Sequence, residues 1–256
     1  MLSKPQIRAI TSLQQKKIRR EHGLFIVEGV KSVGEFLHSD YSIQCIYHTA
    51  QAAAKLPKIP QNIKSVEIDE PTLVRISALK APQGVLAVVR IPRYAPLTAA
   101  MLQQGFHLVL DDIQDPGNLG TIIRTAEWFG LERVICSVGS VDAYNPKTVQ
   151  ASMGSLARMQ VYYTELAELV AHSPVPVFGA VLNGSAIYHT DFGQQGLVVL
   201  GNEGNGIGPA VLPHITQRVT IPRVGHAESL NVAISAALFC AELTRKKKYR
   251  IFTTDG

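Results

Sequence analysis

The sequence lacks the features that mark membrane-spanning, exported and disulfide-rich proteins. No apolar run approaches the roughly 18 residues that a membrane span needs. The opening MLSKPQIRAITSLQQKK has no apolar core of the kind that a secretory signal carries. Three isolated cysteines, Cys45, Cys136 and Cys240, form no CxxC pair, which argues against both a disulfide framework and a zinc site. We therefore expect a cytoplasmic protein in a reducing setting, with neither a membrane nor a metal among its partners.

Several common catalytic motifs are also missing. Neither GxSxG nor HExxH occurs. The glycine-rich stretch Val198–Gly208 is not a dinucleotide fingerprint, because Pro209 stands where the third glycine belongs, and no Lys-Ser/Thr pair follows as in a P-loop. His226-Ala227-Glu228 matches one half of a zinc-deaminase signature, but the PCxxC half is absent. These absences argue against a serine hydrolase, a zinc enzyme and a nucleotide-phosphate cradle.

Charge is unevenly distributed along the 256 residues. Residues 1–95 carry 14 Lys and Arg against 7 Asp and Glu, whereas residues 96–240 carry 6 against 11 and residues 241–256 carry 5 against 2. A basic N-terminal part beside a mildly acidic second part is typical of a polyanion-binding module joined to another domain. Nucleic-acid binding is favoured over the alternative of an ordinary solvated basic surface.

The most basic segment lies at the N-terminus. Residues 4–21 are predicted to form one amphipathic helix with a loose apolar stripe and no acidic residue before Glu21. Contacts with phosphate groups would give affinity without sequence readout. A membrane-surface helix is the weaker alternative, because the stripe has no Trp or Phe. The candidate RNA-binding residues are the cationic side chains of this segment, Arg8, Lys16, Lys17, Arg19 and Arg20.

Short apolar strands alternate with helical segments along most of the chain, which indicates the α/β class. We expect a small basic α/β domain over residues 1–92, a proline-containing linker over 93–105, and a larger α/β domain over 106–256. The strands of the larger domain are continuous apolar runs, as expected for a mostly parallel sheet that is covered on both faces.

Three stretches of this larger domain share a strand–loop–helix pattern. In Asp111–Gly130, Asn118 occupies a predicted helix N-cap and Arg124 lies further into the helix. In Val198–Gly208, a buried strand ends in a glycine-rich loop that carries Glu203. Ligands of parallel α/β sheets bind beyond the carboxyl ends of strands, so the loops could converge on one cleft.

The third stretch, Val219–Leu238, leads into a long helix predicted over Glu228–Lys247. Ser229 and Asn231 flank its start. Helix capping is the plain structural interpretation of Ser229, as it is of Asn118 in the first stretch. From the pattern alone, the three loops predict a small-molecule site with an arginine, joined to a basic module.

Taken together, these stretches resemble the SpoU (TrmH-like) family of RNA 2′-O-ribose methyltransferases in the SPOUT superfamily. The likeness lies in DPGNLGTIIRTAEWFG, VLGNEGNGI and IPRVGHAESLNVAISAAL, in that order at the family's usual spacing, over about residues 106–246. A softer likeness joins GLFIVEGVKSVGEFL to the RNA-binding domain that often precedes this enzyme domain. The resemblance implies a deep trefoil knot, a homodimer and S-adenosyl-methionine as methyl donor.

The resemblance also implies roles for individual residues. The resemblance gives Arg124 the proton of the ribose hydroxyl, whereas a milder physical interpretation has Arg124 clamp the substrate phosphate. Asn118 would position Arg124 or the ribose. Glu203 would brace its loop through backbone amides, while Ser229 and Asn231 would shape the site. The implied cofactor-binding residues lie at strand ends and in loops: Leu200, Gly201, Asn202, Gly204, Ile221 and Leu230.

The leading hypothesis is methyl transfer to a ribose 2′-hydroxyl of a structured RNA, ribosomal RNA before transfer RNA. A non-enzymatic RNA-binding or ribosome-assembly protein is the main alternative. An antibiotic-resistance methyltransferase would use the same chemistry, and the sequence does not separate it from a housekeeping enzyme.

Overall fold

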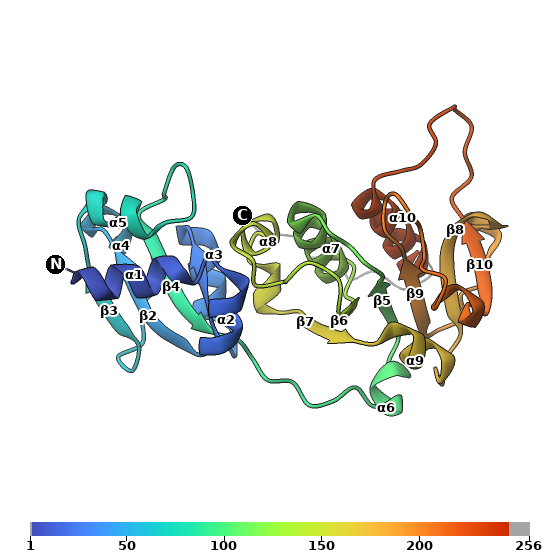
Figure 1. The fold of residues 1–256 in the computed structure, drawn as a ribbon, viewed down its shortest axis with the longest axis horizontal. Coiled ribbons are helices and arrows are strands. Elements are labelled where there is room, and N and C mark those ends of the chain that lie inside the picture. The colour runs from blue at the N-terminus through green and yellow to red at the C-terminus, as the bar shows by residue number, and fades with distance from the viewer. Residues whose placement is uncertain (1, 246–256) are drawn as a thin grey trace, which may run out of the picture.

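The computed structural model describes residues 2–245, and these residues build two separate β-sheets (Figure 1). The N-terminal sheet has four strands in the order β1-β4-β2-β3. The C-terminal sheet has six strands in the order β10-β8-β9-β5-β6-β7. Residues 91–98 form an extended connection between the two halves.

The N-terminal sheet is mixed. Strand β4 pairs antiparallel with both β1 and β2, and β2 pairs parallel with β3. Its strands are β1 (Leu24–Glu28), β2 (Ile43–His48), β3 (Lys64–Glu67) and β4 (Val85–Arg90). The helices of this half are α1 (Lys4–Ser12), α2 (Lys16–His22), α3 (Val30–Leu37), α4 (Ala50–Ala53) and α5 (Glu70–Ile76).

The prediction of one helix over residues 4–21 is wrong, because α1 and α2 are separated by a break at residues 13–15. Gln15 is extended at the start of α2. Arg19 turns back to the break, and its Nη1 donates to the carbonyl oxygens of Leu13 at 3.0 Å and Gln14 at 2.8 Å. A buried arginine thus satisfies backbone groups that the interrupted helix leaves free.

The C-terminal sheet is parallel throughout. Its strands are β5 (Phe106–Leu110), β6 (Arg133–Ser137), β7 (Gln160–Thr164), β8 (Val177–Ala186), β9 (Gly196–Leu200) and β10 (Gln217–Thr220). The helical elements are α6 (Ala99–Leu102), α7 (Pro116–Trp128), α8 (Pro146–Ala151), η1 (Ser155–Ala157), α9 (Leu166–Ala171), η2 (Ile187–His189), η3 (Leu212–His214) and α10 (Val232–Thr244).

Each face of the parallel sheet has its own apolar cluster, since side chains alternate along a strand. Leu108 and Leu110 of β5 join a cluster with α7 and α10, whereas Val109 joins a second cluster with α6 and α9. This two-sided burial accounts for the continuous apolar runs in the sequence.

The path of the chain at its C-terminal end fits the knotted fold implied by the resemblance. Strand β10 lies at the edge of the sheet beside β8. From there the chain returns to the centre, where α10 packs against α7 and β9. The end of the long helix expected up to Lys247 lies outside the described residues, and its start is at Val232 rather than Glu228. No helix in residues 2–245 is long and apolar enough to cross a membrane.

Candidate active site at the carboxyl ends of the parallel strands

The first stretch forms the turn from β5 into α7. The helix begins earlier than expected, with Asp115 as N-cap: its Oδ1 accepts from the backbone N–H of Asn118 at 2.7 Å. Pro116 follows at the first helical position, where a missing N–H costs nothing. The assignment of Asn118 as N-cap is therefore wrong. Asn118 lies in the first turn, and its side chain is free to act elsewhere.

The second stretch places a tight loop, residues 201–208, directly after β9. Asn202 and Gly206 exchange two backbone hydrogen bonds of 2.9 and 2.8 Å. The Asn202 side chain accepts from the N–H of Gly204 at 2.8 Å and donates to the carbonyl of Asp112 at 2.8 Å. Bracing of this loop was expected from Glu203, but Asn202 performs it, and the carboxylate of Glu203 points to other partners.

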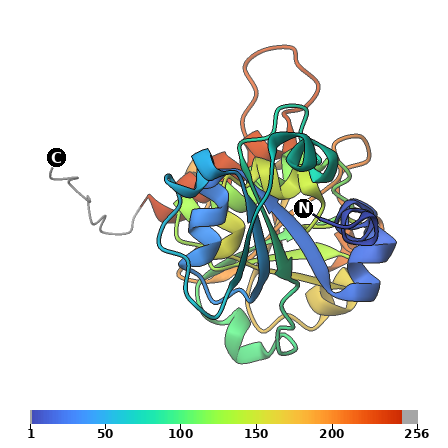
Figure 2. The ribbon, with the colours of Figure 1, turned by 90° about the vertical axis from the view of Figure 1, so that its left-hand side faces the viewer.

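The third stretch contains an exposed loop, residues 221–231, between β10 and α10. It stands clear of the rest of the molecule in both views (Figures 1 and 2). At its end Asn231 caps α10, since its Oδ1 accepts from the N–H groups of Ala233 at 2.9 Å and Ile234 at 3.4 Å. Ser229 and Leu230 lie in the exposed part of the loop.

Three of the expected site residues meet in one polar cluster. Asn118 donates through Nδ2 to Oε1 of Glu203. Asn231 donates through Nδ2 to Oδ1 of Asn118 at 3.1 Å and to Oε1 of Glu203 at 3.4 Å. The convergence of the three loops that the sequence predicted is therefore confirmed, and each loop contributes one side chain. The carboxylate of Glu203, held by the side-chain amides of Asn118 and Asn231, is thus a fixed negative group at the N-terminal ends of α7 and α10.

Arg124 and Ser229 are not part of this cluster. The Arg124 side chain is exposed on α7, and no hydrogen bond or ion pair with it is found within residues 2–245. The Asn118 side chain bonds to Glu203 and Asn231 and makes no hydrogen bond with Arg124, contrary to one of its two expected roles. The guanidinium of Arg124 thus keeps its donors available for an anion outside the chain.

The expected cofactor residues differ in how they are placed. Leu200 is buried at the end of β9, and Gly201 packs so closely on the second loop that a Cβ there would collide with the backbone of Gly206. Gly204 is exposed at the tip of this loop, and Ile221 is half-buried at the start of the third. Leu230 is 46% exposed. The expected residues of the second loop are therefore held in a closed turn, whereas Ile221 and Leu230 belong to a loop that is exposed at almost every position.

The groups that brace the first stretch were not apparent from any sequence pattern. Asp112 adopts a positive φ of 57°, uncommon for a residue with a side chain. Its N–H donates to Oγ of Ser137 at 2.9 Å, and the N–H of Ile113 donates to Oγ of Ser140 at 3.1 Å. Ser137 ends β6, so the loop after a neighbouring strand supports this turn. A positive φ at aspartate has no sequence signature that would have revealed it.

The candidate RNA-binding residues are split by burial. Arg8, Lys16, Lys17 and Arg20 are exposed on α1 and α2. Arg19 is only 1% exposed and is paired with Asp142 of the C-terminal half, so this arrangement removes it from the RNA-binding surface. The prediction for Arg19 fails because burial, rather than charge, decides the position of its side chain.

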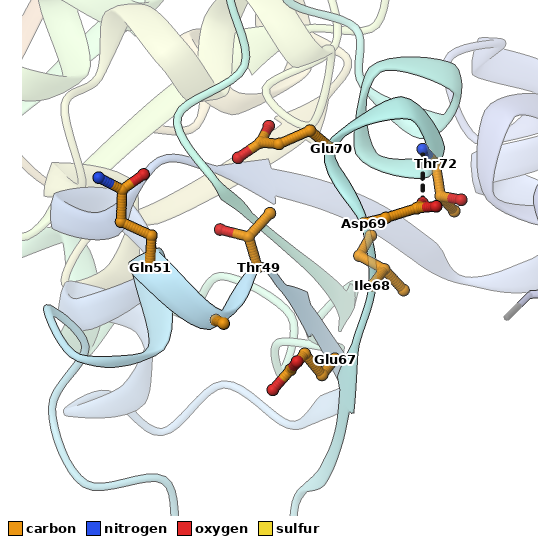
Figure 3. Close-up of a pocket in the computed structure, with 8 residues that line it drawn as sticks. Thr49, Gln51, Glu67, Ile68, Asp69, Glu70 and Thr72 are labelled. Carbon is orange, nitrogen blue, oxygen red and sulfur yellow. Dashed lines mark hydrogen bonds between the residues drawn. The ribbon is translucent and has the colours of Figure 1, made fainter.

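A hollow of about 560 Å³ lies elsewhere in the N-terminal half, between the starts of α4 and α5. Figure 3 shows the side chains of Glu67, Glu70 and Thr49, which are among the residues that line it. Asp69 also lines it and caps α5, accepting from the N–H of Thr72 at 3.0 Å. This acidic lining disfavours phosphate groups, so the hollow is a poor place for an RNA backbone.

The fold and the site define the class to which the molecule belongs. A parallel α/β sheet with three polar loops meeting at one edge, preceded by a basic mixed-sheet domain, is the arrangement of a SPOUT-type methyltransferase with an added RNA-binding part. A family model described as the SpoU rRNA Methylase family matches residues 105–241, more than half of the chain. A model described as an MRM3-like substrate binding domain matches residues 4–87. The chain belongs to the SpoU rRNA methylase family.

Individual relatives agree over nearly the whole chain. The 23S rRNA (guanosine(2553)-2'-O)-methyltransferase RlmP of Bacillus subtilis is 32% identical over 236 residues, covering 90% of this chain and 92% of that protein. A solved structure from Porphyromonas gingivalis, assigned to the TrmH family, is 40% identical with a TM-score of 0.87, covering 96% of this chain and 99% of that one. An AdoMet-bound rRNA methyltransferase from Sinorhizobium meliloti is 29% identical with a TM-score of 0.86, covering 97% of both chains.

Proposed function

We propose that the protein transfers a methyl group from S-adenosyl-methionine to a ribose 2′-hydroxyl of ribosomal RNA. The observation that carries this proposal is the cluster of Asn118, Glu203 and Asn231, which unites the three stretches of the methyltransferase family at one sheet edge. The names of the relatives support ribosomal RNA as the substrate: RlmP is a 23S rRNA 2'-O-methyltransferase, as is RlmB of Acinetobacter baylyi, which is 27% identical over 262 residues.

The residues at the strand ends fit S-adenosyl-methionine. Gly201 leaves no room for a side chain because the loop folds back on it, whereas Gly204 and Gly206 have room beside them, where a ligand can lie directly against the backbone. The carboxylate of Glu203 lies in this loop, and that of Asp111 accepts from the N–H of Gly208 at 2.8 Å. Such negative groups suit a cationic sulfonium and would repel a phosphate. Leu200, Gly201, Asn202 and Gly204 would hold the cofactor from one side, and Ile221 and Leu230 from the other. When bound, it supplies an electrophilic methyl group.

Arg124 acts on the RNA in this proposal. An exposed guanidinium offers a planar fork of donors that matches a phosphate, so it can clamp the backbone next to the reacting ribose and fix the hydroxyl for attack. Removal of the hydroxyl proton by Arg124 itself requires a neutral guanidinium, which water around an exposed side chain opposes. We therefore favour the clamp: as the ribose oxygen bonds to the transferred methyl group, its proton would pass to water, and Ser229 would complete the site from the third loop.

We propose that residues 1–92 bind the RNA and that residues 106–256 transfer the methyl group. The exposed cations of α1 and α2 are the proposed phosphate contacts: Arg8, Lys16, Lys17 and Arg20. Affinity from such contacts falls with salt concentration. Replacing Lys16, Lys17 and Arg20 by glutamine should weaken RNA binding and flatten its dependence on salt, as measured by filter binding. An unchanged slope would place the RNA elsewhere.

We further infer that the enzyme works as a homodimer in the cytoplasm. Three large apolar side chains are exposed on α7, on α10 and just before α10: Trp128 is 82% exposed, Ile234 53% and Leu230 46%. Exposed apolar side chains of this size favour contact with another protein surface. The three cysteines are free and buried, which is consistent with a reducing setting. Light scattering of the wild type and of Trp128→Glu tests the dimer, since a charge in the interface should yield monomers.

The decisive experiment measures methyl transfer to ribosomal RNA by the wild type and by Arg124→Ala. We expect the variant to lose transfer while calorimetry shows nearly unchanged cofactor affinity. Arg218→Ala, which removes an exposed arginine on β10, is the matched control and should remain active. Full activity of Arg124→Ala would exclude its role. Failure of the wild type to bind the cofactor would instead favour the alternative of a non-enzymatic RNA-binding protein.

A further inference from the structure

The two halves of the chain share one continuous apolar core. A single cluster of buried side chains includes Phe25 of β1 and Phe36 of α3, and it continues through Tyr144 and Leu156 around α8 and η1. The rings of Phe25 and Tyr144 lie 4.8 Å apart across the junction. Burial raises the pKa of the hydroxyl of Tyr144 well above its ordinary value, as expected for a junction that excludes water. A linker alone would leave two domains free to move, whereas an apolar junction restrains them.

A buried ion pair lies in this junction. Nε and Nη2 of Arg19 both donate to Oδ2 of Asp142, at 3.0 and 2.6 Å. The remaining nitrogen, Nη1, is held by the carbonyls at the break between α1 and α2. The other carboxylate oxygen of Asp142 accepts from the N–H of Tyr144 at 3.0 Å. Apolar contacts are tolerant of sliding, but this set of directed bonds has one geometry.

A second ionic contact connects the junction with the helix that carries Arg124. Arg158, just after η1, pairs with Glu35 of α3 in the N-terminal half and with Glu127 of α7, the latter at 2.9 Å. Glu127 lies one helical turn beyond Arg124. The space around Glu35 is tight, since a Cβ at Gly154 would lie 2.6 Å from its Cγ. The N-terminal half is thus anchored to the scaffold of α7 as well as to α8.

We propose that Arg19 and Asp142 are positioning residues for methyl transfer: their pair fixes the orientation of the RNA-binding half, so that RNA bound there presents its ribose at Arg124. This proposal rests on the proposed function. The physical reason is that a reacting hydroxyl must be placed within a fraction of an ångström, and misplacement by about 1 Å can cost on the order of a hundredfold in rate. Neither residue touches the RNA or the cofactor, so their effect is on geometry.

The test removes both charges together, because removing one would leave the other buried and unpaired, which destabilises a protein whether or not the pair positions the RNA. In the double variant Arg19→Met with Asp142→Asn, the asparagine oxygen can still accept from Tyr144. We expect kcat to fall on the order of ten- to a hundredfold, with the affinities for RNA and for S-adenosyl-methionine within about twofold of the wild type. Nitroxide labels on Lys64→Cys and Glu168→Cys, one in each half, should give a broadened distance distribution. Arg19→Lys keeps the positive charge but loses the guanidinium group that donates several directed hydrogen bonds. Its kcat should lie between those of the wild type and the double variant.

The outcomes separate the proposal from its alternatives. An unchanged kcat would overturn it, whether or not the distance distribution broadens. A loss of RNA affinity equal to the loss of kcat would also overturn it, since Arg19 would then be a binding residue. Should the double variant fail to fold, the same measurements on Arg19→Lys decide. Arg75→Met, an exposed arginine of the N-terminal half, is the matched control. A wild type that transfers no methyl group would refute the proposed function, while the distance measurement would still test the restraint.

Discussion

The second and third loops follow β9 and β10 of the same sheet, which β8 separates, and both carry residues of the proposed site, yet they differ sharply in structure. The second loop, residues 201–208, is closed by two backbone hydrogen bonds and by the Asn202 side chain. The third loop, residues 221–231, is exposed at almost every position, and Val224 is 101% exposed. It is fixed to the site at its last residue, Asn231.

The proposed cofactor site is therefore formed in advance on one side only. A preformed side reduces the entropy lost when a ligand binds, whereas an open loop must be ordered by the ligand or by a second subunit. We expect substitutions in the second loop to affect folding and binding together. Substitutions in the third loop should affect binding or transfer without affecting the fold, except at Asn231.

The largest effect on stability is expected for Gly201→Ala in the second loop. The added Cβ would collide with Gly206 and Ile207, and both contacts are with backbone that cannot rotate away. We expect the free energy of unfolding to fall by about 3 kcal/mol, at the upper end of overpacking effects. Cofactor binding should disappear from calorimetric titrations, because the loop must shift.

The matched control is the same substitution in the third loop. A Cβ added at Gly225 would meet no atom within 4 Å, and Gly225 has no positive φ, so Gly225→Ala should change stability by less than about 0.5 kcal/mol. Denaturant titrations of the two variants compare the loops directly. Equal stability of both variants would mean that the second loop adapts as freely as the third, and the distinction between them would be lost.

An intermediate effect on stability is expected for Asn202→Ala in the second loop. The substitution leaves the N–H of Gly204 and the carbonyl of Asp112 without their partner, which should cost about 2 kcal/mol. Cofactor affinity should fall about tenfold, the equivalent of 1.4 kcal/mol. Ser229→Ala in the third loop is the counterpart: it should keep wild-type stability and lose transfer in single-turnover assays. A destabilised Ser229→Ala would show contacts that the open loop does not make.

Sequence patterns predicted the parts of this molecule that depend on local periodicity and on the family motifs. The parallel sheet and the convergence of the three strand-end loops are confirmed, because buried strands and strand-end loops have clear patterns. That Asn118, Glu203 and Asn231 bond to one another was not predicted. The prediction that Asn118 is the N-cap of α7 was wrong. Asp115, three residues earlier, is an equally good N-cap residue, and Pro116 is favoured at the first helical position that follows it.

Tertiary contacts account for what the patterns missed. The basic segment at the N-terminus has a helical period on both sides of residues 13–15, so the break between α1 and α2 is invisible without the buried side chain of Arg19. Its partner Asp142 lies 123 positions along the chain, and no local pattern connects them. The role of Asn202 was likewise hidden, since asparagine and glutamate are both plausible braces of a glycine-rich loop.

The smallest effect on stability is expected for substitutions of Asn231, the last residue of the third loop, which bonds to Asn118 and Glu203. Asn231→Ala removes the cap of α10 and should cost about 1 kcal/mol of stability. Asn231→Asp can still cap, so its denaturation midpoint should stay near that of the wild type. Its carboxylate would face Oε1 of Glu203, now 3.4 Å from Nδ2, and two like charges should separate the cluster. Both variants should therefore lose transfer, although only one loses stability. If Asn231→Asp is as unstable as Asn231→Ala, capping is not what Asn231 contributes; if it is fully active, the cluster is not needed for transfer, and the third loop acts independently of the second.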